Sequence, residues 1–265
     1  MEITQLITLG LIVGFLSSFF GIGGGSLIVP ILYGLYPKLP ASVVISTSLG
    51  SIFCVTFINS IKYAKLRQLP PKEIALNLIV TCTVGAFTGS LLLQQVNTQM
   101  AKFSMAIILL LMCGKLLFFK NKPKKLSPKN TPHLIYAFTG LVGAFISSLT
   151  GLGGGIIFTP IFINILKVPT KLVAPYSNLA MAITSFVGLT PLLLTEVNNA
   201  KNFSQGLLQY GFIGSVNIAL VGIITLAAFI SSSQGIKYNN RVLPRTKERI
   251  LAILLLIFSL KLFLS

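Results

Sequence analysis

Acidic residues are almost absent from the sequence, which has four glutamates, no aspartate and a single histidine among 265 residues. Glu73 and Glu196 stand at the ends of apolar segments, and no carboxylate lies deep within one. Proton pumps and many symporters relay protons through buried Asp, Glu or His, so such a relay is not expected here. No nucleophile–base pair, acid pair or cluster of metal ligands is visible either. The sequence therefore predicts no enzyme, no cofactor and no metal site.

Charge of either sign is also scarce, since only 9% of the residues are charged and 54% are hydrophobic. A soluble domain of this size needs more charge to cover its surface. Apolar runs recur along the whole chain, each near the ~20 residues with which a helix crosses a hydrocarbon core. The three cysteines lie inside these runs without metal-ligand or redox spacing, as small buried hydrophobic residues do. We interpret the chain as an all-α, polytopic membrane protein that resides in a lipid bilayer.

The chain contains an internal duplication. Residues 15–25 (FLSSFFGIGGG) match residues 145–155 (FISSLTGLGGG) position by position, without a gap. With the same spacing, the match extends back to Gly10 and Gly140, and forward to Pro30 and Pro160. We predict a first transmembrane repeat over 1–119, a basic cytoplasmic linker over 120–133, and a second transmembrane repeat over 134–265.

Each repeat contains about five apolar segments. The expected segments are 3–20, 26–36, 42–64, 74–96 and 101–119 in the first repeat, and 134–150, 156–166, 172–195, 204–231 and 249–264 in the second. The second segment of each repeat has only eleven residues. As a helix it rises about 16 Å, roughly half the thickness of a hydrocarbon core. The first two segments of each repeat are therefore expected to form a broken or re-entrant pair around the glycines.

The 21 basic residues give a net charge of +17, and fourteen of them lie in three short connections. These connections are 62–72, the linker 120–133, and 237–249. Basic loops between apolar runs indicate the cytoplasmic side rather than a nucleic-acid surface, so no nucleic acid is expected as a partner. Corresponding loops of the two repeats then fall on opposite sides, which predicts inverted-topology repeats. Transporters of that plan hold the substrate near the membrane midplane.

The two glycine-rich turns are the strongest chemical signal. Each precedes a short helix expected to begin at Ser26 or Ile156, and glycine lets backbone N–H groups face a ligand. A helix N-terminus adds unpaired N–H donors and a positive dipole end, so two of them could hold an anion without a cationic side chain. Hydroxyl and amide groups of the third segments could replace water around the anion. The predicted substrate-binding residues are Gly21, Gly23, Gly24, Gly25, Ser26, Thr47, Ser48, Ser51, Thr150, Gly151, Gly153, Gly154, Gly155, Ser177 and Asn178.

A structural alternative stands beside this hypothesis. The spacing Gly-x-x-x-Gly at Gly21, Gly151, Gly10 and Gly85 also suits close helix packing. Serine and threonine in membrane helices often bond only to their own backbone.

The duplicated SSxxGxGGG turn, the short segment reaching Pro30 or Pro160, and Thr47-Ser48 resemble the TauE/SafE sulfite exporter family over essentially the whole chain. The resemblance implies a multi-pass protein of the bacterial cytoplasmic (inner) membrane that transports a small anion, such as sulfite or an organosulfonate like sulfoacetate. The second repeat has Tyr176-Ser177-Asn178 where the family often has a Thr-Ser pair. An anion channel, or a membrane scaffold that transports nothing, remains as an alternative.

Overall fold

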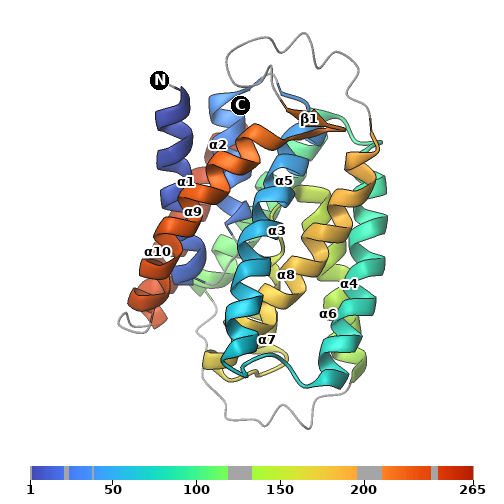
Figure 1. Cartoon of the computed structure of the whole chain (residues 1–265), viewed down its shortest axis with the longest axis vertical. Helices are drawn as coiled ribbons and strands as arrows, with labels where there is room; N and C mark the ends of the chain where they lie inside the picture. The colour runs from blue at the N-terminus through green and yellow to red at the C-terminus, as the bar shows by residue number, and fades with distance from the viewer. Residues whose placement is uncertain are drawn as a thin grey trace.

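The computed structural model describes residues 2–20, 24–37, 39–118, 133–195, 211–239 and 244–264. This part of the chain forms ten helices and one short hairpin (Figure 1). The helices of the first half are α1 (Glu2–Phe20), α2 (Gly25–Leu35), α3 (Ala41–Lys65), α4 (Lys72–Leu93) and α5 (Thr98–Phe118). Those of the second half are α6 (His133–Thr150), α7 (Gly155–Asn164), α8 (Thr170–Leu193), α9 (Ile218–Asn239) and α10 (Pro244–Leu264).

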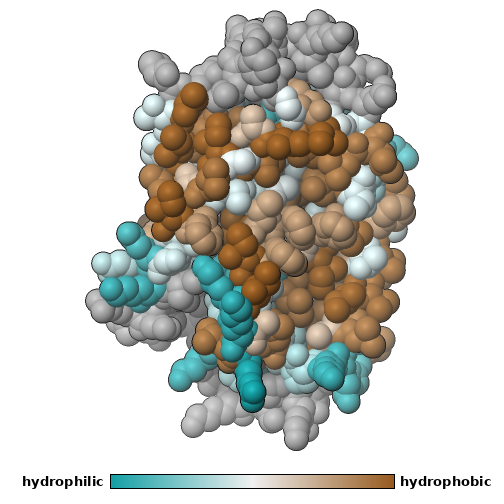
Figure 2. Space-filling model, viewed as in Figure 1, coloured by the Kyte–Doolittle hydropathy of each residue, from teal (hydrophilic) through white to brown (hydrophobic). Residues whose placement is uncertain are grey.

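The outer surface of the helices is apolar, as contact with lipid requires. Six of the described helices, α3, α4, α5, α6, α8 and α9, contain stretches long and apolar enough to cross a membrane. Large aliphatic side chains such as Leu134 and Leu226 are 78% and 70% exposed. Figure 2 shows a broad hydrophobic face, with hydrophilic side chains gathered toward its lower end. The chain is a multi-pass helical membrane protein.

Helices of the first half pair with helices of the second half. α1 packs along α9, and α4 packs along α6. The remaining close pairs, α3 with α8 and α5 with α10, also join the two halves. Figure 1 shows α3 descending while α8 ascends, with α2 in the upper part and α7 in the lower part of the molecule. The two halves are therefore interlocked, and corresponding helices run in opposite directions.

Glycines make the same close contacts in both halves. A β-carbon built on Gly89 of α4 would collide with the carbonyl oxygen of Phe145 in α6. One built on Gly235 of α9 would collide with the carbonyl oxygen of Phe15 in α1, the residue that corresponds to Phe145. Backbones that approach this closely leave no room for a side chain, which is the packing role expected of small residues in membrane helices.

A hairpin interrupts the second half, where the sequence predicts a continuous apolar segment over 204–231. Residues 204–210 lie outside the described residues, but β1 (Phe212–Ile213) and β2 (Val216–Asn217) pair antiparallel before α9 begins at Ile218. The expected bounds are wrong because Phe212 and Ile213 extend the apolar run across a turn made by Gly214, whose φ is +56°. Other boundaries also differ: α9 ends at Asn239 rather than at residue 231, α10 begins at Pro244 rather than at residue 249, and α6 begins at His133, which the sequence places in the linker.

Because corresponding helices run in opposite directions, the C-terminus and the central linker are predicted to lie on opposite sides of the membrane. A reporter fused after Ser265 and one inserted in the linker 120–132 should report opposite sides of the membrane. In Figure 1 the C-terminus lies at the upper end, and α6 begins at the lower end. Accessibility of both reporters in intact cells and in inverted vesicles provides the measurement, and placement of both on one side would contradict the inverted arrangement.

The close packing of α4 on α6 predicts a local effect on stability. Gly89→Ala should lower stability by about 1–3 kcal/mol, because the methyl group forces the two backbones apart. Gly114→Ala in α5 is the matched control, since a β-carbon there meets nothing within 4 Å. Thermal unfolding of both variants in detergent tests this, and an equal Tm for the two would refute tight packing at Gly89.

Candidate functional site at the paired glycine turns

The two short helices begin in the same unusual way. Gly24 precedes α2 with φ +75°, and Gly154 precedes α7 with φ +80°. Their carbonyl oxygens accept the first helical hydrogen bonds, from Leu27 and Ile28 in α2 and from Ile157 and Phe158 in α7. Neither helix start receives a side-chain cap. The N–H groups of the first turn have no partner inside the helix, so they are free to donate to groups outside it.

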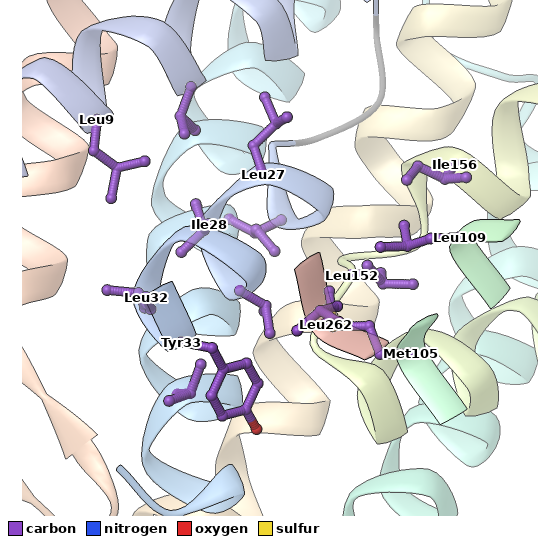
Figure 3. Packing of buried hydrophobic residues seen from close by; sticks show 14 of the residues in the cluster. Leu9, Leu27, Ile28, Leu32, Tyr33, Met105, Leu109, Leu152, Ile156 and Leu262 are labelled. Atoms are coloured by element: carbon purple, nitrogen blue, oxygen red, sulfur yellow. The ribbon is translucent and has the colours of Figure 1, made fainter. Parts of the chain in front are cut away.

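The starts of the two helices touch. A β-carbon built on Gly25 would lie 2.6 Å from the carbonyl carbon and oxygen of Leu152, in the second turn. The same position lies 2.5 Å from Cδ1 of Ile52, and a β-carbon on Gly153 would lie 2.6 Å from that same Cδ1. Leu152 and Ile156 belong to the same buried cluster as Leu27 and Ile28 of α2 (Figure 3). The fold thus brings both turns to one point, midway along α3.

Helix α3 holds the second turn in place. The hydroxyl of Ser48 donates a hydrogen bond of 2.9 Å to the carbonyl oxygen of Gly151. Cγ2 of Ile45, one helical turn earlier, would lie 3.0 Å from a β-carbon on Gly151, where φ is +70°. Glycine is needed here both for this left-handed backbone and for the close approach of α3.

Matching serines lie behind the two turns. Oγ of Ser17 would lie 3.7 Å from a β-carbon on Gly24, and Oγ of Ser147 would lie 3.1 Å from one on Gly154. Ser17 and Ser147 occupy equivalent positions of the two repeats, as do Gly24 and Gly154. The same pair of groups, a glycine cap and a serine hydroxyl, is therefore built twice.

Two hydroxyls at the turns are buried without a hydrogen-bond partner. Ser26, in the first turn of α2, and Ser147, beside Gly154, are both fully buried. A buried hydroxyl without a partner costs roughly 1–3 kcal/mol, so each needs an explanation. Together with the N–H groups of the helix starts, they form a set of neutral donors suited to an oxyanion.

Other predicted hydroxyls have partners elsewhere. Thr47 accepts a hydrogen bond from the backbone of Asn217 in the hairpin, and Ser177 bonds Thr159 of α7. Ser51 and Thr150 donate to carbonyls of their own helices, at Thr47 and Ile146. Ser51 and Thr150 therefore bond only to the backbone of their own helices in the contacts seen, as the structural alternative expects.

The side-chain amide of Asn178 bonds both its own helix and another helix. Its nitrogen donates to Ala174 in its own helix, and its oxygen accepts a bond of 3.3 Å from Asn59 of α3. Gly155 begins α7, whereas Gly21 and Gly23 lie outside the described residues.

Two residues escaped the sequence interpretation: Ile52, which lies between the turns, and Asn59, which bonds Asn178. Ile52 is an aliphatic residue in an apolar run, and nothing in the sequence distinguishes it from its neighbours. Asn59 carried a usable signal, because an amide is costly inside an apolar segment unless it has a polar partner. Among the described residues, no three His, Cys, Asp or Glu side chains gather as a metal site.

Comparison with known proteins gives a family for this fold. The model of the family described as sulfite exporter TauE/SafE matches residues 6–262. A probable membrane transporter protein of Methanocaldococcus jannaschii is 29% identical over 91% of this chain and 87% of its own length. A probable membrane transporter protein of Haemophilus influenzae is 28% identical over 94% of this chain and 91% of its own length. No solved structure matches. The interlocked helices and paired glycine turns described above therefore belong to a membrane transporter of the TauE/SafE sulfite exporter family.

Proposed function

We propose that this transporter is a secondary carrier of a small oxyanion, sulfite or an organosulfonate such as sulfoacetate, across the cytoplasmic membrane of a bacterium. The observation that carries the proposal is the meeting of two uncapped helix starts at Ile52, midway along a spanning helix. Helix N-termini attract anions through their unpaired N–H groups and positive dipole ends. The sulfur chemistry comes from the family description, sulfite exporter.

In this proposal each part of the site has a distinct role. The N–H groups that follow Gly24 and Gly154 bind the anion, and the hydroxyls of Ser26 and Ser147 complete its coordination. Ser48 fixes the second turn to α3, so the two helix starts keep their relative position. The opposed halves then move against each other around this point and expose it to one side of the membrane at a time.

Flux in proteoliposomes tests the proposal. The panel contains sulfite, sulfate, thiosulfate, sulfoacetate, taurine and lactate, each with and without a pH gradient. Saturable flux of one sulfur anion is the expected result, and its response to the pH gradient would identify coupling to protons. Flux that never saturates would instead favour a channel. No flux from protein shown to be folded would contradict the proposal.

Substitution of the glycine caps should abolish this flux. Gly154→Val places a branched side chain on a left-handed backbone, which costs about 1–2 kcal/mol. The new side chain would also collide with the ring of Phe158, which lies only 2.5 Å from a β-carbon built on Gly154. Gly24→Val should act alike in the first turn, with expression retained in both. Gly222→Val in α9, where a β-carbon meets nothing within 4 Å, is the control. Normal transport by both cap variants would refute this placement of the site.

The unpartnered serines separate binding from stability. Ser26→Ala and Ser147→Ala should leave Tm unchanged or slightly higher, because no hydrogen bond is lost. Ser48→Ala should lower stability by about 1 kcal/mol, because its bond to Gly151 is lost. We expect the first two variants to raise the KM for the transported anion. An unchanged KM in both would show that these hydroxyls do not contact the substrate.

A further inference from the structure

The side chain of Ile52 occupies the point where the two turns meet. It is fully buried, and its Cδ1 contacts Gly25 of the first turn and Gly153 of the second. On the Gly153 side, Cγ2 and Cγ1 would also lie 2.9 Å and 3.3 Å from a β-carbon. One aliphatic side chain therefore lies between the two glycine-rich turns.

An apolar group in this position has a clear physical consequence. It can satisfy none of the N–H groups of the helix starts, and it excludes the water that could do so. An anion that is to occupy the point between the turns must first displace Ile52, because this side chain fills that point.

The duplication shows that this side chain is not a symmetric requirement of the fold. The residue of α8 that corresponds to Ile52, by the constant spacing of the two repeats, is Ala182. A single methyl group in the second half suffices for packing there, since Ala182 is itself buried. Of these two equivalent positions, only the one in α3 carries a branched side chain.

Polar groups follow on the same side of α3, toward its basic end. Asn59 lies two helical turns beyond Ile52 and lines a small cavity with Val55, Thr225, Phe229 and Ser232. The cavity has a volume of about 10 Å³, at the lower limit of the space that one water molecule needs. Nζ of Lys62 lies 5.1 Å from the centre of the Phe229 ring, which lines the same cavity. An amide and a basic side chain therefore lie between Ile52 and the basic loop that follows α3.

We propose that Ile52 is the gate of the translocation path and sets the size of the anion that passes. This inference rests on the transport function proposed above. The side chain swings away from Gly25 and Gly153 when α3 and α8 shift, and the room it vacates holds the anion. Sulfite fits the space of one branched side chain, whereas a longer organosulfonate, sulfoacetate included, does not, so of the substrates proposed above the gate selects sulfite.

Flux ratios test the size filter in the full-length protein. Sulfite and 1-propanesulfonate are compared for the native protein, Ile52→Ala and Leu49→Ala. Leu49 is the matched control, because it is equally buried on α3 but packs among Ile45, Leu93 and Leu192. Ile52→Ala should raise the flux of the sulfonate relative to sulfite by about tenfold or more, since methylenes in a packed pocket discriminate on that scale. An unchanged ratio in a folded variant that carries sulfite would overturn the proposal.

Access to the turn provides a measurement that needs no transport. Ser26→Cys is introduced after Cys54, Cys82 and Cys113 are replaced by alanine, and its reaction with a small methanethiosulfonate is timed. The thiol should react slowly when Ile52 is present and faster with Ile52→Ala, but not with Leu49→Ala. Equal rates in all three would overturn the gate even if transport is observed. Conversely, faster labelling with no flux of any anion would refute the proposed function and leave the gate standing.

A milder variant keeps the test decisive if Ile52→Ala does not fold. Ile52→Val removes one methyl group, and both the flux ratio and the labelling rate should change in the same direction by a smaller amount. No change in either quantity would overturn the proposal.

Discussion

A membrane-spanning helix satisfies its own backbone, but α2 and α7 begin inside the molecule, where no preceding turn supplies carbonyls for their first N–H groups. Neither start has a side-chain cap, and both are buried. Unpaired donors in an apolar interior are costly, and two sets of them in contact are costlier still. An anion relieves this cost, because it accepts several hydrogen bonds at once and interacts favourably with both dipole ends.

The rest of the architecture holds these two starts together. Each helix of the first half that packs closely packs against the second half, so neither half forms its own complete core. The two halves fill equivalent space with different side chains. Gly143 of the second half corresponds to Val13 of the first. The ring of Phe158 packs against Gly143, 2.5 Å from a β-carbon built on this glycine. Such compensating changes let two copies of one sequence diverge while the glycine caps keep the same backbone.

Much of the fold could be predicted from the sequence, because the duplication aligns the first three helices of each half. The fourth helix of the second half was misplaced, since α4 begins at Lys72 and α9 at Ile218, farther along the chain than the constant spacing of the repeats places it. The extra residues include the hairpin, whose apolar strands cannot be told from helix by hydropathy. Within the site, Thr47 and Ser48 of the third segment were both predicted to contact the substrate. Adjacent helical residues point about 100° apart, which is why Ser48 bonds the second turn while Thr47 bonds the hairpin, a difference that the sequence did not reveal.

The neutrality of the candidate site agrees with the proposed task of moving an anion rather than storing it. The side chains found against the described glycines of the turns are aliphatic, aromatic or hydroxyl-bearing, and none of them ionises. A lysine or arginine at this depth would attract an anion strongly, because charges interact far more in a low-dielectric interior than in water. Release would then be slow, and transport needs binding weak enough to leave as well as to enter. In the proposed mechanism, backbone dipoles and hydroxyls give that moderate attraction, and selection among anions is left to the space that Ile52 fills.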